Sequence, residues 1–356
     1  MAAPTRLLIA ASGTGGHLFP AIALAQQLPD YEIEWLGTAN RMETSLVPDD
    51  YPLNTIPVEG FQQKFSPKTL KIMAGFFSSI WQTQKLIKEH KINAVFTTGG
   101  YIAAPAILAA RMHNKPAIIH ESNYIPGKVT KFLSRWCDAV ALGFAGTSKY
   151  LPQTETVHVS TPVRSQFLTP QPVDLDIPDE AIVILVVGGS QGAVAVNKLV
   201  REAAPAWFDF GAYVVHLTGK NDPEADCLKH SNYIALPFSD NMAGLLQRAD
   251  LAISRAGAGT ITELSFTGTP AVLIPYPYAA EDHQTYNAQE YKDAGAGVVY
   301  QQASITVEIL QEQVCQWLRS PELIEQMSEK AKALAVRDSA ERLAKLIRDL
   351  VNDSDR

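Results

Sequence analysis

Cysteine and long apolar runs are both scarce in this chain of 356 residues. Its three cysteines, Cys137, Cys227 and Cys315, lie far apart and form no CxxC pair, which argues against a disulfide framework and against a thiolate metal site. No stretch approaches the roughly 20 apolar residues of a membrane-spanning helix, and the apolar start of the chain breaks at Ser12, too early for an export signal. We therefore expect a cytoplasmic protein, soluble or peripheral to a membrane.

Positive charge is also in short supply. The net charge of −7 argues against nucleic acid as a partner, because nucleic-acid binding needs a basic surface. Hydrophobic residues make up 46% of the chain and charged residues 19%, which is typical of a globular protein with a sizeable core. The length exceeds that of a single hydrophobic core, so two domains are expected.

Short apolar runs typical of buried strands alternate with helical segments throughout, which predicts an α/β fold with parallel sheets. The predicted strands are 6–11, 33–36, 94–98, 117–120 and 139–142 in the first half, and 182–187, 213–218, 233–236, 251–254, 271–274 and 298–300 in the second. Between the halves, 162–178 is rich in proline and lacks periodicity, so we interpret it as a linker. The tail is predicted to form helices from Ser320 and again after Asp338.

Two glycine-rich loops, 13–17 and 188–192, each follow a predicted strand and precede a predicted helix. Such a turn leaves backbone N–H groups at the positive end of a helix dipole, which suits a phosphate. Neither loop is GxGxxG, and neither is followed by Lys-Ser/Thr, so NAD binding and P-loop ATPase activity are not indicated. The pair suggests twin nucleotide-type domains that face a shared cleft.

His17 in the first loop is a candidate general base, since histidine titrates near working pH; the alternative is a helix-start residue bonded to backbone. Polar residues also follow two further predicted strands, at 97–101 and 120–123, and ligands bind beyond the carboxyl ends of parallel strands. Glu121 there is either functional or a structural carboxylate that satisfies loop N–H groups, whereas Asn123 is expected to face outward.

The second half carries two dense polar segments, 254–264 and 282–288. Glu263, about one turn into a predicted helix, is placed to accept two hydrogen bonds from a ribose diol, although a capping role is the alternative. Gln284 belongs to a segment that resembles a reader of sugar hydroxyls. Asp174 and Asp176 match a metal-binding Asp-x-Asp pair, but they lie in the proline-rich linker and we treat the match as chance.

A stripe of apolar side chains, Phe76, Phe77, Ile80 and Trp81, recurs at helical spacing and is flanked by lysines. A buried helix face and a surface that rests on anionic lipid both explain this pattern.

Taken together, these segments resemble the MurG family of N-acetylglucosaminyltransferases, and the resemblance spans nearly the whole chain. The motifs that carry it are 13–17 with Pro20, 99–101 with Pro105, 120–123, 162–164, 188–193, 254–255 with Glu263, and Asp282, Gln284 and 287–288. Ser12, Ala103, Ser122 and Thr161 depart from the usual family residues. The resemblance implies the GT-B fold, with two Rossmann-like halves: residues 1–162, joined by a C-terminal helix 338–356, for the acceptor and the membrane, and 163–337 for the donor.

The resemblance also implies an inverting transfer of N-acetylglucosamine from UDP-GlcNAc to the MurNAc 4-hydroxyl of lipid I, which forms lipid II for peptidoglycan. No metal or other cofactor is implied. The expected location is the cytoplasmic face of the plasma (inner) membrane, as a peripheral protein, with other cell-wall synthesis proteins as further partners. The open alternatives are another UDP-sugar enzyme of the same fold, such as a glycolipid glycosyltransferase or a UDP-GlcNAc 2-epimerase, and a non-catalytic UDP-sugar or membrane binding protein.

Residue roles follow from the matched positions. The resemblance assigns His17 and Glu263 to catalysis, Ser190 to the donor phosphate, Glu263 to the ribose, and Gln284 and Asn123 to the sugar. Further expected donor contacts are Arg164, Ser239, Ala258, Gly259 and Thr260, and the loop expected to face the acceptor and its diphosphate comprises Thr14, Gly15, Gly16 and His17, with Tyr101 nearby.

Overall fold

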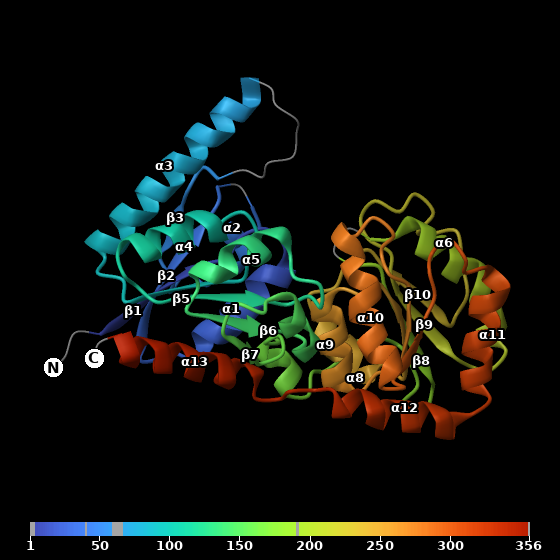
Figure 1. Ribbon diagram of the computed structural model, residues 1–356. Helices are drawn as coiled ribbons and strands as arrows, with labels where there is room; N and C mark the ends of the chain where they lie inside the picture. Colours follow the sequence, from blue (N-terminus) through green and yellow to red (C-terminus); the bar gives the residue numbers. More distant parts are fainter. Residues whose placement is uncertain (1–3, 40, 59–66, 190–191, 355–356) are drawn as a thin grey trace. The chain divides into compact units, whose positions relative to one another are not determined.

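The computed structural model describes residues 4–39, 41–58, 67–189 and 192–354, with the backbone alone at 67–71. It divides into two compact units, unit 1 with Met1–Arg164 and Asp338–Arg356, and unit 2 with Ser165–Arg337. Each unit contains one parallel sheet with helices packed on it (Figure 1). The prediction of an α/β fold with two parallel-sheet domains is confirmed.

The sheet of unit 1 has seven strands in the order β3-β2-β1-β4-β5-β6-β7. Their bounds are β1 Thr5–Ala10, β2 Tyr31–Gly37, β3 Leu53–Thr55, β4 Ala94–Thr97, β5 Ala117–Glu121, β6 Ala139–Leu142 and β7 Thr156–His158. The helices are α1 Gly15–Gln26, α2 Glu43–Leu46, α3 Pro67–Glu89, α4 Ala103–Met112, α5 Lys128–Leu133 and α13 Ser339–Ser354, with short 3-10 turns η1 Ser134–Trp136 and η2 Ala145–Tyr150.

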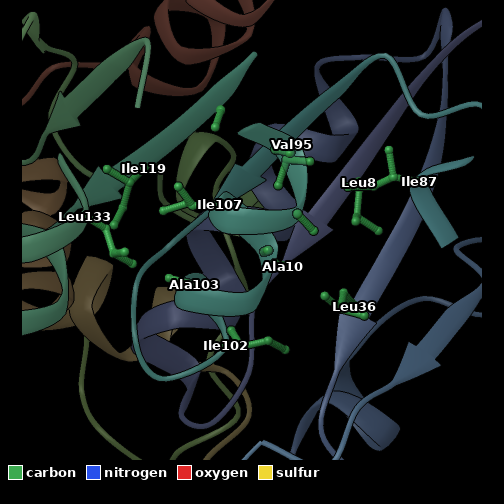
Figure 2. Packing of buried hydrophobic residues seen from close by; sticks show 14 of the residues in the cluster. Leu8, Ala10, Leu36, Ile87, Val95, Ile102, Ala103, Ile107, Ile119 and Leu133 are labelled. Atoms are coloured by element: carbon green, nitrogen blue, oxygen red, sulfur yellow. The ribbon is translucent and has the colours of Figure 1, made fainter. Parts of the chain in front are cut away.

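The alternation of side chains along β1 divides the core of unit 1 into two layers, because successive residues of a strand point to opposite faces. Leu8 and Ala10 pack with residues of α3, α4 and α5, such as Ile87 and Ile107 (Figure 2). On the other face, neighbouring residues of β1 pack with α1 and with α13, which lies along α1 (Figure 1). The last helix of the chain thus completes the first unit.

The sheet of unit 2 has six strands in the order β10-β9-β8-β11-β12-β13. The strands are β8 Val183–Val187, β9 Tyr213–Leu217, β10 Tyr233–Leu236, β11 Leu251–Ser254, β12 Ala271–Leu273 and β13 Gly297–Val299. The helices are α6 Val194–Ala203, α7 Pro205–Phe208, α8 Met242–Arg248, α9 Ala258–Thr267, α10 His283–Asp293, α11 Val307–Leu318 and α12 Pro321–Ala333, with 3-10 turns η3 Ser165–Leu168 and η4 Ala280–Asp282.

Both sheets follow the doubly wound order, in which the chain returns to the middle of the sheet for its fourth strand. The point where the winding reverses lies between β1 and β4 in unit 1 and between β8 and β11 in unit 2. Ligands of such sheets bind outside the carboxyl ends of the strands at this point. The two glycine-rich loops follow β1 and β8, so each occupies the same position in its own sheet.

Every strand expected from the sequence is present, with ends shifted by at most two residues. The short strands β3 and β7 were not predicted. Each has three residues at the edge of the sheet, Leu-Asn-Thr in β3 and Thr-Val-His in β7, so neither contains the apolar run that marks the equally short β12 and β13.

Candidate functional site

The first glycine-rich loop joins β1 to α1 in unit 1. Its Gly13 has a φ of +108°, a backbone conformation that favours glycine. Thr14 is the N-cap of α1 but makes no side-chain capping bond. The first N–H groups of a helix have no partner within it, and they lie at the positive end of its dipole. The loop therefore presents amides suited to an anion.

His17, in the first turn of α1, is held by the end of β4. Its Nδ1 lies 2.8 Å from the carbonyl oxygen of Thr98. A carbonyl only accepts, so Nδ1 carries the proton of the neutral ring and Nε2 keeps its lone pair. Gly99 and Gly100 both have positive φ, and a Cβ built at Gly100 would lie 4.0 Å from Nε2. The alternative interpretation of His17, a helix-start residue bonded to backbone, describes the Nδ1 contact. The ring is half-buried, and Nε2, the nitrogen that a general base would use, lies beside two residues without side chains.

The loop after β5 is organised by Glu121, which is 6% exposed. Its carboxylate accepts hydrogen bonds from Asn123 N at 3.0 Å, Gly127 N at 3.0 Å and Thr130 Oγ1 at 2.6 Å. Thr147 Oγ1 donates to the carbonyl oxygen of Asn123 at 3.2 Å. These contacts are those of a structural carboxylate that satisfies loop N–H groups, which is one of the two interpretations given for Glu121. Asn123 Nδ2 also donates to Glu121 Oε1 at 3.3 Å, so the half-buried side chain of Asn123 lies against this carboxylate.

Arg164 ends unit 1 and lies beside the start of α1. Its Cζ is 4.5 Å from the centre of the Phe19 ring, a cation–π distance. The same ring borders Gly15, where an added Cβ would lie 2.6 Å from Phe19 Cε2. A guanidinium is thereby held near the N-terminus of α1. Tyr101, in the turn before α4, is 44% exposed.

The second glycine-rich loop joins β8 to α6 in unit 2. Ser190, assigned above to the donor phosphate, lies outside the described residues. A Cβ at Gly188 would be 2.6 Å from Ala193 N, and a Cβ at Gly192, whose φ is +75°, would be 2.7 Å from the carbonyl oxygen of Thr218. Glycine is therefore needed at both positions for the tight turn into α6.

Three residues that the resemblance assigns to the donor lie at the start of α9. Ala258, Gly259 and Thr260 are its first residues, and its N-cap Gly257 has no side chain to cap them. A Cβ built at Gly259 would meet nothing within 4 Å, so space above this turn is open. Glu263 lies one turn further along and is half-buried.

Gln284, near the start of α10, links the loops after β11 and β12. Its Oε1 accepts hydrogen bonds from Ala256 N at 3.2 Å and Tyr276 N at 2.9 Å. Because both backbone donors bond to Oε1, the Nε2 end of the amide points away from them. Ser239 Oγ accepts from Asn241 N at 3.1 Å, next to Phe238, whose side chain is 61% exposed.

Sequence reasoning missed a buried polar network beneath the second loop. Asn197 of α6 donates through Nδ2 to Thr218 O at 2.7 Å and to Asp222 Oδ2 at 2.6 Å. Its Oδ1 lies 3.0 Å from His216 Nε2, and Arg201 pairs with Asp222 at 2.7 Å. Burial, together with the charge of Arg201, lowers the pKa of His216 to about 4. The network supports Thr218, against which Gly192 packs. No local signal reveals it, because its members are distant in sequence.

Arg255, at the end of β11, is a second buried cation. It donates to the carbonyl oxygens of Ile274 and Pro275, each at 3.0 Å, and to Gln302. Burial lowers its pKa. Its guanidinium therefore joins the ends of β11 and β12.

The lysine-flanked stripe lies on α3, and the structure divides its members. Phe77 and Trp81 are 62% and 64% exposed, while Phe76 packs against the core beside α4 and Ile80 is half-buried. Lys85 Nζ lies 6.0 Å from the Trp81 ring centre. The buried-face interpretation thus describes Phe76, whereas Phe77 and Trp81 are exposed and their contact with lipid stays a prediction. Over the described part of the chain, the helices are too short or too polar to cross a membrane.

Comparison with known proteins defines the class. The N-terminal domain of glycosyltransferase family 28 matches residues 7–142, and the C-terminal domain of that family matches residues 183–343. The chain belongs to glycosyltransferase family 28.

Several relatives of 61% to 65% identity share one description. The UDP-N-acetylglucosamine–N-acetylmuramyl-(pentapeptide) pyrophosphoryl-undecaprenol N-acetylglucosamine transferase of Gloeothece citriformis is 65% identical over 97% of this chain and 96% of its own. The protein with the same description from Microcystis aeruginosa is 64% identical over 97% of each chain. The crystal structure of Acinetobacter baumannii MurG has a TM-score of 0.77 and 32% identity, covering 97% of this chain and all of that one. The expected MurG resemblance and GT-B fold are confirmed.

Proposed function

We propose that this chain transfers N-acetylglucosamine from UDP-GlcNAc to the 4-hydroxyl of the MurNAc group of lipid I, which forms lipid II. The observation that carries the proposal is the 65% identity, over nearly the full length, to a transferase of this description. The position of a glycine-rich loop at the winding reversal of each sheet supports it. Two diphosphate-bearing substrates need two such anion sites.

In the proposed reaction His17 is the base. Its Nε2 takes the proton of the acceptor hydroxyl as the oxygen attacks the anomeric carbon, and the bond from that carbon to the UDP oxygen breaks with inversion. The Nδ1 bond to Thr98 O fixes the tautomer that this step needs. Negative charge that develops on UDP is stabilised by amides of the second loop, by the dipole of α6 and by Arg164.

The remaining roles are part of the same proposal. On the donor side, Glu263 holds the ribose, Ser190 the phosphate, Gln284 and Asn123 the sugar, and the backbone near Ser239 the uracil. The start of α9, at Ala258, Gly259 and Thr260, contributes amides, because its first turn is not capped by a side chain. On the acceptor side, Thr14, Gly15, Gly16 and Tyr101 face the diphosphate of lipid I.

We also propose that the enzyme works on the cytoplasmic face of the plasma membrane, as a peripheral protein. The support is the pair Phe77 and Trp81, two exposed aromatic side chains with Lys85 beside them on α3. Aromatic rings among lysines suit the surface of an anionic bilayer. Other cell-wall synthesis proteins are expected partners at that surface.

One experiment separates this function from its alternatives. The full chain is incubated with UDP-GlcNAc labelled in the sugar, with and without lipid I, and the products are resolved. Label in lipid II only when lipid I is present is the expected result. Altered UDP-sugar without any acceptor would instead indicate an epimerase, and donor binding without any product would indicate a non-catalytic binding protein.

A further inference from the structure

A buried carboxylate, Glu43, organises the first glycine-rich loop from a distant part of unit 1. It is the first residue of α2, and none of its surface is exposed. Its Oε1 accepts hydrogen bonds from Ser12 Oγ at 2.6 Å, Thr38 N at 2.7 Å and Thr38 Oγ1 at 2.9 Å. Its Oε2 accepts from Gly13 N at 3.2 Å. The carboxylate therefore ties the end of β2 to the loop after β1.

The surroundings of Glu43 are built to keep it charged. Burial opposes ionisation, but the bonds from Ser12, Thr38 and Gly13 outweigh it, so that the pKa of Glu43 is lowered. Among the residues that the structure describes, the ion pairs include none with Glu43. Gly37 makes room for the side chain, since a Cβ there would lie 2.8 Å from Glu43 Cγ. The carboxylate thus relies on hydrogen-bond donors from the loop after β1 and from Thr38 after β2.

We propose that Glu43 is a positioning residue for glycosyl transfer, an internal anion that fixes Ser12 and Gly13 and, through them, the start of the helix that carries His17. The proposal rests on the function proposed above. The loop enters α1 one residue after Gly13, at Thr14, and His17 lies in the first turn of that helix. A displacement of Gly13 is therefore transmitted directly to the base.

The same geometry assigns different tasks to the amides of the loop. Gly13 N–H already donates to Glu43, so it has no hydrogen left for the acceptor. The diphosphate of lipid I must take its amide contacts from residues after Gly13, at the start of α1. The first loop is thus an anion site that is partly filled by the protein's own carboxylate.

The test is a mutant cycle in the full chain with Glu43→Gln, His17→Ala and the double variant. A 1 Å displacement of a reacting group can cost about 10²-fold in rate, so Glu43→Gln is expected to lower kcat by about that factor while UDP-GlcNAc binding is unchanged. If Glu43 acts through His17, its replacement adds little in the His17→Ala background, because residues that act as a unit are not additive. A merely structural role would lower the activity of both backgrounds by the same factor.

Glu34→Gln is the matched control. Glu34 is also a mostly buried carboxylate of unit 1, bonded to Asn54 and His90 rather than to the loop, and its replacement should leave kcat unchanged. If Glu43→Gln does not fold, Ser12→Ala, which removes one donor to the carboxylate, takes its place in the cycle with a smaller expected loss.

Each outcome has one interpretation. A folded Glu43→Gln or Ser12→Ala variant with wild-type kcat would overturn the inference, as would equal losses in both His17 backgrounds. A wild-type chain that makes no lipid II would instead overturn the proposed function.

Discussion

Acidification should destabilise unit 2 through His216. Its imidazole is buried, and burial, aided by the charge of Arg201 and opposed by that of Asp222, lowers its pKa from 6.5 to about 4. In the unfolded chain the ring titrates near its usual value. Between these two pH values the unfolded state binds a proton that the folded state does not. Folding stability is therefore unaffected by this ring above pH 6.5 and falls as the pH falls toward 4.

The contacts of the buried ring are satisfied in its neutral form, while burial disfavours the charged form. Asn197 uses Nδ2 to donate elsewhere, so its Oδ1 accepts from His216 Nε2 at 3.0 Å, and His216 Nδ1 accepts from the Tyr233 hydroxyl at 2.7 Å. The difference between pKa values of 6.5 and about 4 corresponds to about 3 kcal/mol of unfolding free energy, at about 1.4 kcal/mol for each pH unit.

Hydrogen exchange read by mass spectrometry measures this effect where it arises. Peptides from α6 and β9, at 194–203 and 213–217, should lose protection in the wild type between about pH 7 and about pH 4, after correction for intrinsic exchange rates. His216→Gln removes the titrating group. The loss of protection free energy on acidification should therefore be about 3 kcal/mol smaller in this variant than in the wild type. Tyr233→Phe keeps the ring and should retain the acid loss. Equal pH dependence in the wild type and His216→Gln would refute the reasoning.

Three further predictions concern unit 1. His17→Ala should lower kcat by about 10² to 10⁴-fold with UDP-GlcNAc binding unchanged, as measured by lipid II formation and by calorimetry; near wild-type turnover would exclude His17 as the base. Replacing Phe77 and Trp81 together by serine should reduce cosedimentation with phosphatidylglycerol vesicles without lowering Tm, because both side chains are exposed; unchanged sedimentation would exclude this face from lipid contact. Arg348→Ala removes the hydrogen bonds from α13 to Gln27 O and Asp30. It should lower the free energy of unfolding, measured with denaturant, by about 1 kcal/mol; an unchanged free energy would argue against Arg348 as an anchor of α13.

Much of the fold was predictable because its signals are local. A buried parallel strand is a short apolar run, and the runs at β1, β8 and β11 are followed at once by small or polar loop residues. The strand β3 gave no such signal, because its sequence Leu-Asn-Thr is not an apolar run and its place in the sheet comes from pairing with β2. The roles of Glu263, Gln284 and Asn123 remain predictions from the family resemblance.

Contacts between distant residues were beyond sequence reasoning. Glu43 is one polar residue among many in its segment until folding brings it against Ser12 and Gly13. The same holds for His216 and Asn197, which meet only because β9 lies under α6. The stripe on α3 was ambiguous for a related reason. Apolar residues at helical spacing, such as Phe76 and Phe77, indicate a helix with an apolar stripe, but only packing decides which of them the core covers.

The sequence by itself determined the order of strands and helices, the two glycine-rich loops and the membership of a glycosyltransferase family, because each depends on residues adjacent in the chain. Tertiary structure alone decided that both loops occupy the winding reversal of their sheets, that His17 carries its proton on Nδ1, and that Glu43 and His216 support the loops from beneath. These features depend on distances between segments far apart in sequence, and such distances exist only once the strands have paired.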